Sequence, residues 1–536
     1  MRHSLLPYPQ APQLAKTDVA YATADPKLRP FYQHPPHPSS LPALLAERQP
    51  RTYPRADVVA VLREQYSHLP AQPATARNTD ALLDAGTYTV TTAHQPSLFL
   101  GPLYFLYKAL STINLAGQAE AQLGGSVRIV PVFVLGSEDH DLEELNSIQL
   151  YGKRLQWASP ETGAVGSMST SSLAPVLAEL RAILGESPAA QQVYARVERA
   201  YTQSATLAEA TQAMLHDLFG HYGLLVLNMN DARLKRHFVP VMQDEVLHQT
   251  SQRLVSATIG ELQQAGFKTQ AAPRDINLFY LLPGSRERIA AATLPDGSAG
   301  YQVLNSERTF SRTEMLEEMA SQAERFSPNV VLRPLYQEML LPNLAYVGGG
   351  GELAYWLERK AQFEHYGVPF PMLVRRNSAL WVDRETGKKL GRLGFGAAQF
   401  FGETESLVRD FVSRHAAGEV SLSPEIGDLK RLYEALAHKA TAIDPTLEKA
   451  LRAEEVKAVA GLEQWQSRLV RAEKQKHEVA LNQLRALKEK LFPANGLQER
   501  TDNFMPYLVK YGDAFVAELK AAFQPLEPGF LILEEE

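Results

Sequence analysis

A buried strand that ends in a run of charge constrains the fold of this chain more than any other segment. Residues 127–146, VRIVPVFVLGSEDHDLEELN, begin as an apolar run that stops at a glycine, and Glu138, Asp139, His140 and Asp141 follow. A pattern compatible with a helix then resumes. Burying four adjacent ionisable groups costs free energy unless partners compensate them. The segment therefore predicts either a binding site or a densely hydrogen-bonded turn at the end of a strand.

The preceding residues place this strand in a parallel sheet. Residues 87–92, TYTVTT, have the composition of a strand. Pro102 then suits the first position of a helix, because its missing N–H would be unpaired there anyway. Apolar residues recur along that helix at Leu103, Leu106, Leu110 and Ile113. Strand, helix and strand in this order form a βαβ unit, which implies a parallel sheet whose strand ends bind ligands.

Similar patterns return along the chain and predict an α/β fold. Further strands are expected at residues 223–227, 344–347 and 368–374. We expect the parallel-sheet core to span residues 81–384, with helical insertions near 170–218 and 232–325. The second insertion contains a small β excursion at residues 277–289, and residues 1–80, with a helix near 56–66, form an N-terminal extension packed on the core.

The last third of the chain, residues 385–536, is predicted to be helical. Between about 425 and 492 apolar residues recur every three or four positions with charges between them, which is the pattern of a coiled coil. The pattern is interrupted near Lys476, and Pro493 stops it. An antiparallel helical arm for dimerisation, or for covering a neighbouring site, is the simplest interpretation, followed by a C-terminal return segment.

Composition excludes several classes of function. The 536 residues include no cysteine, which rules out disulfides, cysteine-bound metals and a thiolate nucleophile. A net charge of −6 gives no basic surface for nucleic acid or an anionic membrane. No apolar run reaches the roughly 18 residues of a membrane span, and the N-terminus lacks the apolar core of a secretory signal. We expect a cytoplasmic protein.

Two residues between the first strand and its helix are candidates for binding. His94 and Gln95 lie where a helix N-terminus would attract a nucleotide or substrate phosphate. A loop histidine that caps local carbonyl groups is the alternative, and for a single residue the more frequent one. Lys108 follows on the same helix, on the face opposite most of the leucines, and we expect it to be solvated.

The charged loop itself divides into two parts. Asp141 and Glu144 stand three residues apart, as in a capping box, so Asp141 is assigned to the start of a helix. Glu138, Asp139 and His140 remain candidates for binding an ammonium group, a sugar hydroxyl or Mg²⁺, which usually takes one or two protein carboxylates together with substrate oxygens. No HxH or HExxH spacing supports zinc, and no dedicated metal site is predicted.

A run of four glycines follows another predicted strand. Gly348, Gly349 and Gly350 would let the backbone approach a ligand, and the start of the next helix would attract an anion. The spacing matches neither the dinucleotide fingerprint nor the P-loop. A flexible turn with Glu352 in the first turn of the helix is an equally good interpretation.

Two arginines follow the last predicted strand of the core. Arg375 and Arg376 could clamp a phosphate or a carboxylate, because guanidinium groups bind both with paired hydrogen bonds. A basic turn at the surface is the alternative, and spacing alone leaves the two open.

Three blocks of sequence resemble one known family, the cysteine-adding enzymes of bacillithiol biosynthesis. They are residues 94–110 (HQPSLFLGPLYFLYKAL), 130–146 (VPVFVLGSEDHDLEELN) and 326–356 (FSPNVVLRPLYQEMLLPNLAYVGGGGELAYW). The resemblance covers nearly the whole chain and is weakest over residues 1–80 and the coiled coil. Four glycines stand where a Gly-Gly-Pro type of loop is more usual, which affects loop geometry and removes no charged group.

The resemblance implies a fold, a reaction and partners. The fold is a Rossmann-like core related to class I aminoacyl-tRNA synthetases and nucleotidylyl transferases, with helical insertions and a coiled-coil domain that makes a homodimer. The reaction would join the carboxyl group of L-cysteine to the amine of glucosaminyl-malate. By analogy with the synthetases, ATP would activate the cysteine as an adenylate.

The same resemblance suggests roles for the candidate residues. His94, Arg375 and the amides of residues 348–351 would stabilise charge on the α-phosphate. Glu138 and Asp139 would hold a substrate ammonium group or Mg²⁺, and His140 would assist proton removal from the attacking amine. Two alternatives remain open: a sugar hydrolase or phosphoesterase that uses the acidic loop, and a non-catalytic scaffold built on the coiled coil.

Overall fold

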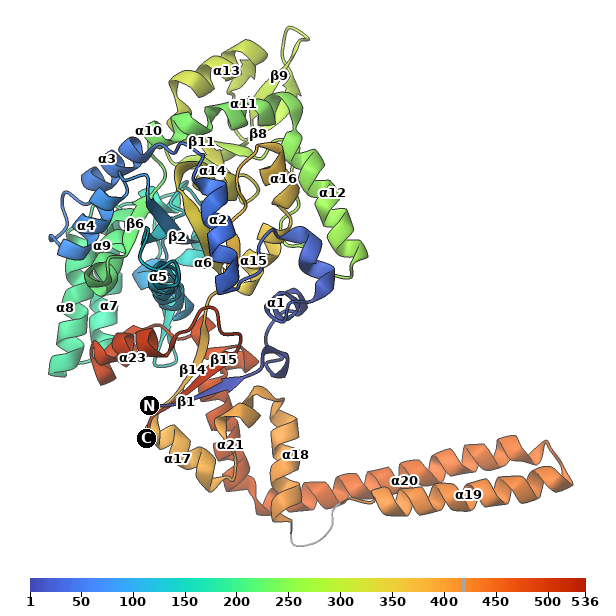
Figure 1. Cartoon of the computed structure of the whole chain (residues 1–536). Coiled ribbons are helices and arrows are strands. Elements are labelled where there is room, and N and C mark those ends of the chain that lie inside the picture. Colours follow the sequence, from blue (N-terminus) through green and yellow to red (C-terminus); the bar gives the residue numbers. More distant parts are fainter. Residues whose placement is uncertain (417–420) are drawn as a thin grey trace.

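A five-stranded parallel sheet forms the centre of the molecule in a computed structural model that describes residues 1–416 and 421–536 (Figure 1). The sheet has the order β13-β12-β2-β3-β6, and all neighbouring strands are parallel. The strands are β2 (Thr87–His94), β3 (Arg128–Leu135), β6 (Leu225–Asn228), β12 (Asn343–Gly348) and β13 (Met372–Arg375). Since β2 comes first along the chain, the strand order reverses between β2 and β12, as in a Rossmann-like sheet.

The predicted βαβ unit is present and buried on both faces. β2 and β3 pair over their whole length, whereas β3 pairs with β6 only from Val132, directly after Pro131. The connecting helix α5 (Tyr104–Gln122) begins two residues after Pro102. Both strands are almost entirely buried, which explains why β3 is an unbroken apolar run rather than an alternating one.

The first 80 residues run from the small C-terminal sheet to the central parallel sheet. β1 (Arg2–Leu6) pairs with a strand from the far end of the chain, and α1 (Lys16–Ala22) packs against α15, at the end of the central sheet. α2 (Leu41–Arg48), α3 (Arg55–Gln65) and α4 (Pro73–Ala81) then cover strands β12 and β6. The helix expected near residues 56–66 is confirmed as α3.

Two insertions interrupt the parallel sheet. The first contains α6 (Leu142–Leu145), the hairpin β4 (Ser147–Leu150) and β5 (Lys153–Gln156), and helices α7 (Ala174–Leu184), α8 (Pro188–Thr202) and α9 (Leu207–Phe219). The second begins with α10 (Ala232–Lys235), α11 (Val239–His248) and α12 (Thr250–Gln264), and ends with α13 (Arg312–Ser321) and α14 (Arg333–Leu340). Between them lies a second sheet.

That second sheet is larger than the predicted β excursion. Its order is β10-β9-β8-β7-β11, antiparallel throughout, from β7 (Leu278–Leu282), β8 (Ser285–Thr293), β9 (Ala299–Val303), β10 (Thr309–Ser311) and β11 (Phe326–Pro328). The sequence signal is weak because β8, SRERIAAAT, is half exposed and contains few of the residues that favour strands.

The C-terminal part has a small sheet and a long arm (Figure 1). β15 (Phe530–Glu534) lies between β1 and β14 (Ser378–Val382). The arm is the antiparallel pair α19 (Ser423–Ile443) and α20 (Leu447–Lys476), and it stands away from the body. The remaining helices are α15 (Gly350–Leu357), α16 (Lys360–His365), α17 (Arg384–Arg392), α18 (Thr404–His415), α21 (Glu478–Leu491), α22 (Met505–Tyr511) and α23 (Ala514–Ala522).

The arm is shorter than the predicted coiled coil. α20 ends at Lys476, where the polar residue interrupts the pattern, and α21 turns back into the body. Leu484, Leu487 and Leu491 are buried there against the small sheet and its helices. In the part of the chain that the structure describes, no helix is both long enough and apolar enough to cross a membrane.

The carboxyl group of Glu338, in α14, is buried beside the start of β12. Glu338 is 2% exposed and accepts hydrogen bonds from the side chains of Gln337 (2.9 Å) and Asn343 (2.8 Å). Burial raises its pKa from 4.5 to about 7, despite the nearby positive charge of Arg48. Because the pKa is higher in the folded state, the stability that the neutral carboxyl group provides is lost as the pH rises through about 7.

We expect Glu338→Gln to remove this pH dependence while keeping the acceptor oxygen. Relative to the wild type, the variant should be more stable at pH 8 than at pH 5, by up to about 3 kcal/mol. Urea unfolding at the two pH values measures the difference, with the exposed Glu179→Gln as the control. An equal difference at both pH values would contradict the assignment.

Candidate active site

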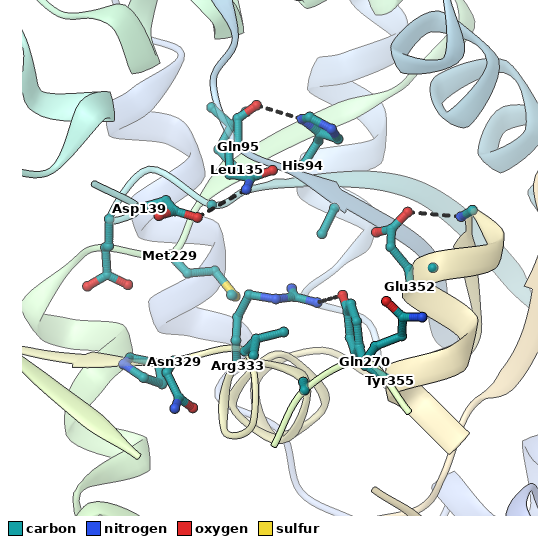
Figure 2. A pocket seen from close by; sticks show the side chains of 18 of the residues that line it. His94, Gln95, Leu135, Asp139, Met229, Gln270, Asn329, Arg333, Glu352 and Tyr355 are labelled. Carbon is teal, nitrogen blue, oxygen red and sulfur yellow. Dashed lines mark hydrogen bonds between the residues drawn. The ribbon is translucent and has the colours of Figure 1, made fainter. Parts of the chain in front are cut away.

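A cavity of about 460 Å³ opens at the carboxyl ends of the parallel strands (Figure 2). Residues that follow β2, β3 and β12 line one side of it, and residues from α14, α15 and the loop after α12 line the other. It therefore lies where the strand order reverses, between β2 and β12, which is the place where open α/β sheets bind ligands.

His94 lies at the end of β2 with both ring nitrogens engaged. Its Nδ1 is 2.9 Å from the carbonyl oxygen of Gln95, and its Nε2 is 3.1 Å from the hydroxyl oxygen of Tyr104. Burial, together with the positive charge of Lys108, lowers the pKa of His94 to about 4. The imidazole is thus neutral at physiological pH, and it orients Tyr104 beside the cavity.

Lys108 is buried, so the expectation of a solvated lysine is wrong. The side chain is 1% exposed, and its ammonium group lies 2.7 Å from a carboxylate oxygen of Glu352 and donates to the carbonyl oxygen of Ala93. Glu352 also accepts hydrogen bonds from Tyr346 (2.7 Å) and from the backbone N–H of Gly349 (2.9 Å). The prediction failed because α5 is covered on the face opposite its leucines as well.

The ion pair with Lys108 keeps the carboxyl group of Glu352 ionised. Burial raises the pKa of the carboxyl group, but the ion pair with Lys108 outweighs burial and keeps the pKa below its ordinary value. Burial lowers the pKa of Lys108 in turn. The hydrogen bond from Gly349 completes the capping of α15, which fixes the start of this helix at the cavity wall.

The glycines of the predicted loop have different surroundings. Gly349 and Gly351 line the cavity, whereas Gly348 and Gly350 do not. A Cβ atom on Gly350 would lie 2.2 Å from the carboxyl group of Asp18, while one on Gly351 would meet nothing within 4 Å. Gly350 is therefore required by the close approach of Asp18.

The two arginines after β13 point to different partners. Arg375 is buried and forms two hydrogen bonds with Asp18, of 2.7 and 3.0 Å, so it lies outside the cavity. Arg376 lines the cavity, and its Nη2 donates to Glu499 at 2.6 Å. The structure thus brings Arg376, but not Arg375, together with His94.

The acidic loop after β3 contributes two residues to the cavity. Glu138 forms an ion pair with the buried Lys235. Asp139 accepts a hydrogen bond from the side chain of Gln95 at 3.0 Å. Burial raises the pKa of Asp139, but the hydrogen bond from Gln95 and the charge of Arg286, 3.9 Å away, outweigh it and lower the pKa.

The other two residues of this loop lie outside the cavity. The side chain of His140 is 47% exposed, and its Nδ1 is 3.1 Å from a guanidinium nitrogen of Arg286. Asp141 accepts the backbone N–H of Glu144 at 3.4 Å and caps α6, as the spacing predicted, although this helix is only four residues long.

Three arginines that sequence reasoning did not select line the cavity: Arg286, which lies near Asp139, and Arg333 and Arg500. Arg333 hydrogen-bonds to Gln337 (3.0 Å) and Tyr355 (3.4 Å) and extends toward the cavity centre (Figure 2), and Arg500 enters from the loop after α21. Neither has a carboxylate within 4 Å among residues 1–416 and 421–536, whereas Arg376 is paired. Arg333 lies within residues 326–356, one of the three blocks that carry the family resemblance, but no local pattern marks Arg500.

The donor set does not provide a ready metal site. Within the described residues, no group of three or more histidine, aspartate or glutamate side chains is arranged to hold a metal ion. Glu138 and Asp139 each face a cationic side chain, which would repel a divalent ion. Together, the charges favour an anionic ligand at Arg333 and Arg500.

A Rossmann-like sheet with a charged cavity at its switch point defines an α/β enzyme, and comparison with known proteins gives the family. The N-terminal Rossmann-like domain of bacillithiol biosynthesis BshC matches residues 1–377, and the C-terminal coiled-coil domain of BshC matches residues 379–535. The chain belongs to the BshC family. This result confirms the suspected resemblance and the predicted fold class.

Curated relatives support the same assignment over almost the whole chain. The protein named "Putative cysteine ligase BshC" from Flavobacterium psychrophilum is 36% identical to this chain, over 98% of each of the two chains. The protein of the same name from Flavobacterium johnsoniae is 37% identical, over 95% of each chain. The relative in Salinibacter ruber is 32% identical over 83% of this chain and 82% of its own. The chain is therefore a ligase of bacillithiol biosynthesis, in preference to a hydrolase or a scaffold.

The glycine run offers a matched pair of variants. We expect Gly350→Ala to lower the free energy of unfolding by about 3 kcal/mol, because its methyl group would displace Asp18 from Arg375 and leave a buried charge unpaired. Gly351→Ala should instead leave stability unchanged or raise it by up to about 1 kcal/mol, since alanine favours a helix. Urea unfolding of both variants measures this difference, and equal stabilities would refute it.

Proposed function

We propose that the chain joins the carboxyl group of L-cysteine to the amine of glucosaminyl-malate and uses ATP to activate that carboxyl group. The reaction would take place in the cytoplasm, where ATP is available. The observation that carries this proposal is the pair of guanidinium groups, Arg333 and Arg500, that face the cavity without a carboxylate partner in the described part of the chain. An anionic substrate would supply the missing charge.

The chemistry of both substrates suits this charge. Glucosaminyl-malate carries two carboxylates, and ATP carries a chain of phosphates, so each can bind arginine through paired hydrogen bonds. In the activation step a carboxylate oxygen of cysteine would attack the α-phosphorus, and pyrophosphate would leave. The amine nitrogen would then attack the carbonyl carbon, AMP would leave, and the nitrogen would lose a proton.

The residues of the sheet edge have distinct parts in this proposal. Arg376 and the first turn of α15 would stabilise negative charge that develops on the phosphate, a role first expected of Arg375. His94 would hold Tyr104 and the backbone of Gln95 in place rather than bind phosphate itself, because both of its nitrogens are engaged.

Glu138 and Asp139 form the side of the cavity that suits the amine. Of the three residues expected to handle it, these two line the cavity and His140 does not. We assign Glu138 the role of accepting a hydrogen bond and then the proton from the substrate amine, with Lys235 fixing the carboxylate. Mg²⁺ has no part in this scheme, because both carboxylates already face cationic side chains.

The direct test incubates the pure protein with L-cysteine, glucosaminyl-malate and ATP. We expect a new thiol with the mass of bacillithiol, and one AMP for each thiol formed. Formation of ADP instead would replace the adenylate step by an acyl phosphate. Absence of the thiol in a folded preparation would refute the proposed substrates, and cleavage of glucosaminyl-malate without cysteine would favour a hydrolase.

Arg333→Gln tests the anionic site in the same assay. Losing a charged hydrogen-bonding group should raise the KM for glucosaminyl-malate or ATP roughly tenfold or more. Arg325→Gln is the matched control, because Arg325 is paired with Glu318 outside the cavity and its loss should leave KM unchanged.

We further propose that the arm makes a homodimer. α19 and α20 pack against each other, yet several large apolar side chains on them stay exposed, including Leu436 (39%), Trp465 (57%), Leu469 (40%) and Val456 (69%). Exposed apolar side chains on a helical pair suit packing against a second copy of the arm.

Charged residues in that surface should separate the two copies. We expect wild-type protein to have the mass of a dimer in light scattering after gel filtration, and Trp465→Glu with Leu469→Glu to have the mass of a monomer. Lys457→Glu on the same helix is the control and should stay dimeric. A monomeric wild type, or a dimeric double variant, would contradict this interface.

A further inference from the structure

A segment without helix or strand forms one wall of the cavity. Residues 265–277, here called the strap, connect α12 to β7. Gln270 and Ala271, in the middle of the strap, line the cavity opposite the ends of the parallel strands. The position of this wall depends on what holds the strap, because the strap has no ladder or helix of its own to fix its backbone.

Two adjacent buried charges hold the middle of the strap. Glu358, directly after α15, accepts a hydrogen bond of 2.7 Å from the backbone N–H of Gln270. Arg359 donates to the carbonyl oxygen of Ala271 at 3.4 Å. Both charged side chains are 0% exposed, and they form an ion pair of 3.3 Å with each other.

The hydrogen bonding of this pair is incomplete. One carboxylate oxygen of Glu358 and two guanidinium nitrogens of Arg359 have no hydrogen-bond partner in the described part of the chain. A buried ion pair with unsatisfied atoms is often no better for stability than two apolar side chains of the same size. Among the described residues, Glu358 Oε2 and Arg359 Nη1 meet only each other, in the ion pair, and the hydrogen bonds that the two side chains make go to the strap.

The strap presents an exposed polar side chain, that of Gln270, to the cavity. Gln270 lies on the wall with Tyr355 and Glu352 (Figure 2), and its side-chain amide has no hydrogen bond to any of the described residues. An amide both donates and accepts hydrogen bonds, so it suits a hydroxyl group, which does the same. Arg333 and Arg500 can bind the charged groups of a ligand.

We propose that Glu358 and Arg359 are positioning residues that hold the strap so that the Gln270 amide binds a hydroxyl group of the sugar ring of the acceptor substrate. This inference rests on the proposed function for the identity of that substrate. Neither charged residue touches the ligand. Their effect passes through two backbone groups, and it concerns the aminosugar and not the cysteine.

The test compares stability with the KM for each substrate. The double variant Glu358→Met with Arg359→Met should keep the urea midpoint of the wild type or exceed it, but raise the KM for glucosaminyl-malate roughly tenfold while the KM for cysteine stays unchanged. Gln270→Ala should cause the same rise. Combining all three changes should not raise the KM for glucosaminyl-malate further, because each change removes the same interaction.

Two further variants separate positioning from general damage. Glu358→Gln keeps an acceptor oxygen for the Gln270 N–H but leaves Arg359 without its counter-charge, so the urea midpoint should fall while the KM stays near the wild-type value. Lys268→Ala changes an exposed strap residue that does not line the cavity and should alter neither quantity. If KM follows stability across these variants, the pair is merely structural and the proposal is wrong.

Hydrogen exchange makes the test independent of the proposed substrates. If the wild type fails to use glucosaminyl-malate, the proposed function fails, and the strap is judged from the exchange of its backbone amides. Peptides that cover residues 267–273 should exchange at least tenfold faster in the double Met variant than in the wild type. Unchanged exchange would overturn the proposal whatever the substrate is.

Discussion

The buried ion pair between Lys108 and Glu352 is the contact on which the geometry of the cavity depends. The Lys108 ammonium group donates to the carbonyl oxygen of Ala93, near the end of β2, and Glu352 caps the helix that follows β12. The pair therefore fixes the spacing of the two strand ends between which the strand order reverses. His94 and Gln95 on one side and Gly349 on the other take their positions from it.

The two domains that the family comparison separates along the chain are continuous in space. The boundary near residue 378 falls between β13 and β14, yet the buried carboxylate of Glu499 binds Arg376 on one side of that boundary and the backbone of Ala379 on the other. Asn503 donates to the carbonyl oxygens of Phe99 and Gly101 in the loop after β2. The C-terminal part thus shapes the cavity as well as carrying the arm.

Sequence patterns predicted the parts of the fold that depend on local order. The strand, charged loop and capped helix around Asp141 are present, as are the parallel core and the interruption of the helical pattern near Lys476, although the arm ends there and does not continue to Pro493. The side chains whose positions were predicted wrongly are those whose partners are distant in sequence. Arg375 is taken from the cavity by Asp18, and Lys108 is buried by Glu352, and neither partner can be read from spacing.

The order of strands in the small sheet has a consequence for how the molecule is completed. β15 lies between β1 and β14, so the central strand of this sheet is also the last of its three strands to be synthesised. Until residues 530–534 leave the ribosome, the first strand of the chain has no partner, and its unpaired edge must stay exposed or be protected. The parallel sheet can form earlier, but β1 gains its partner only after the arm and residues 530–534 have been made.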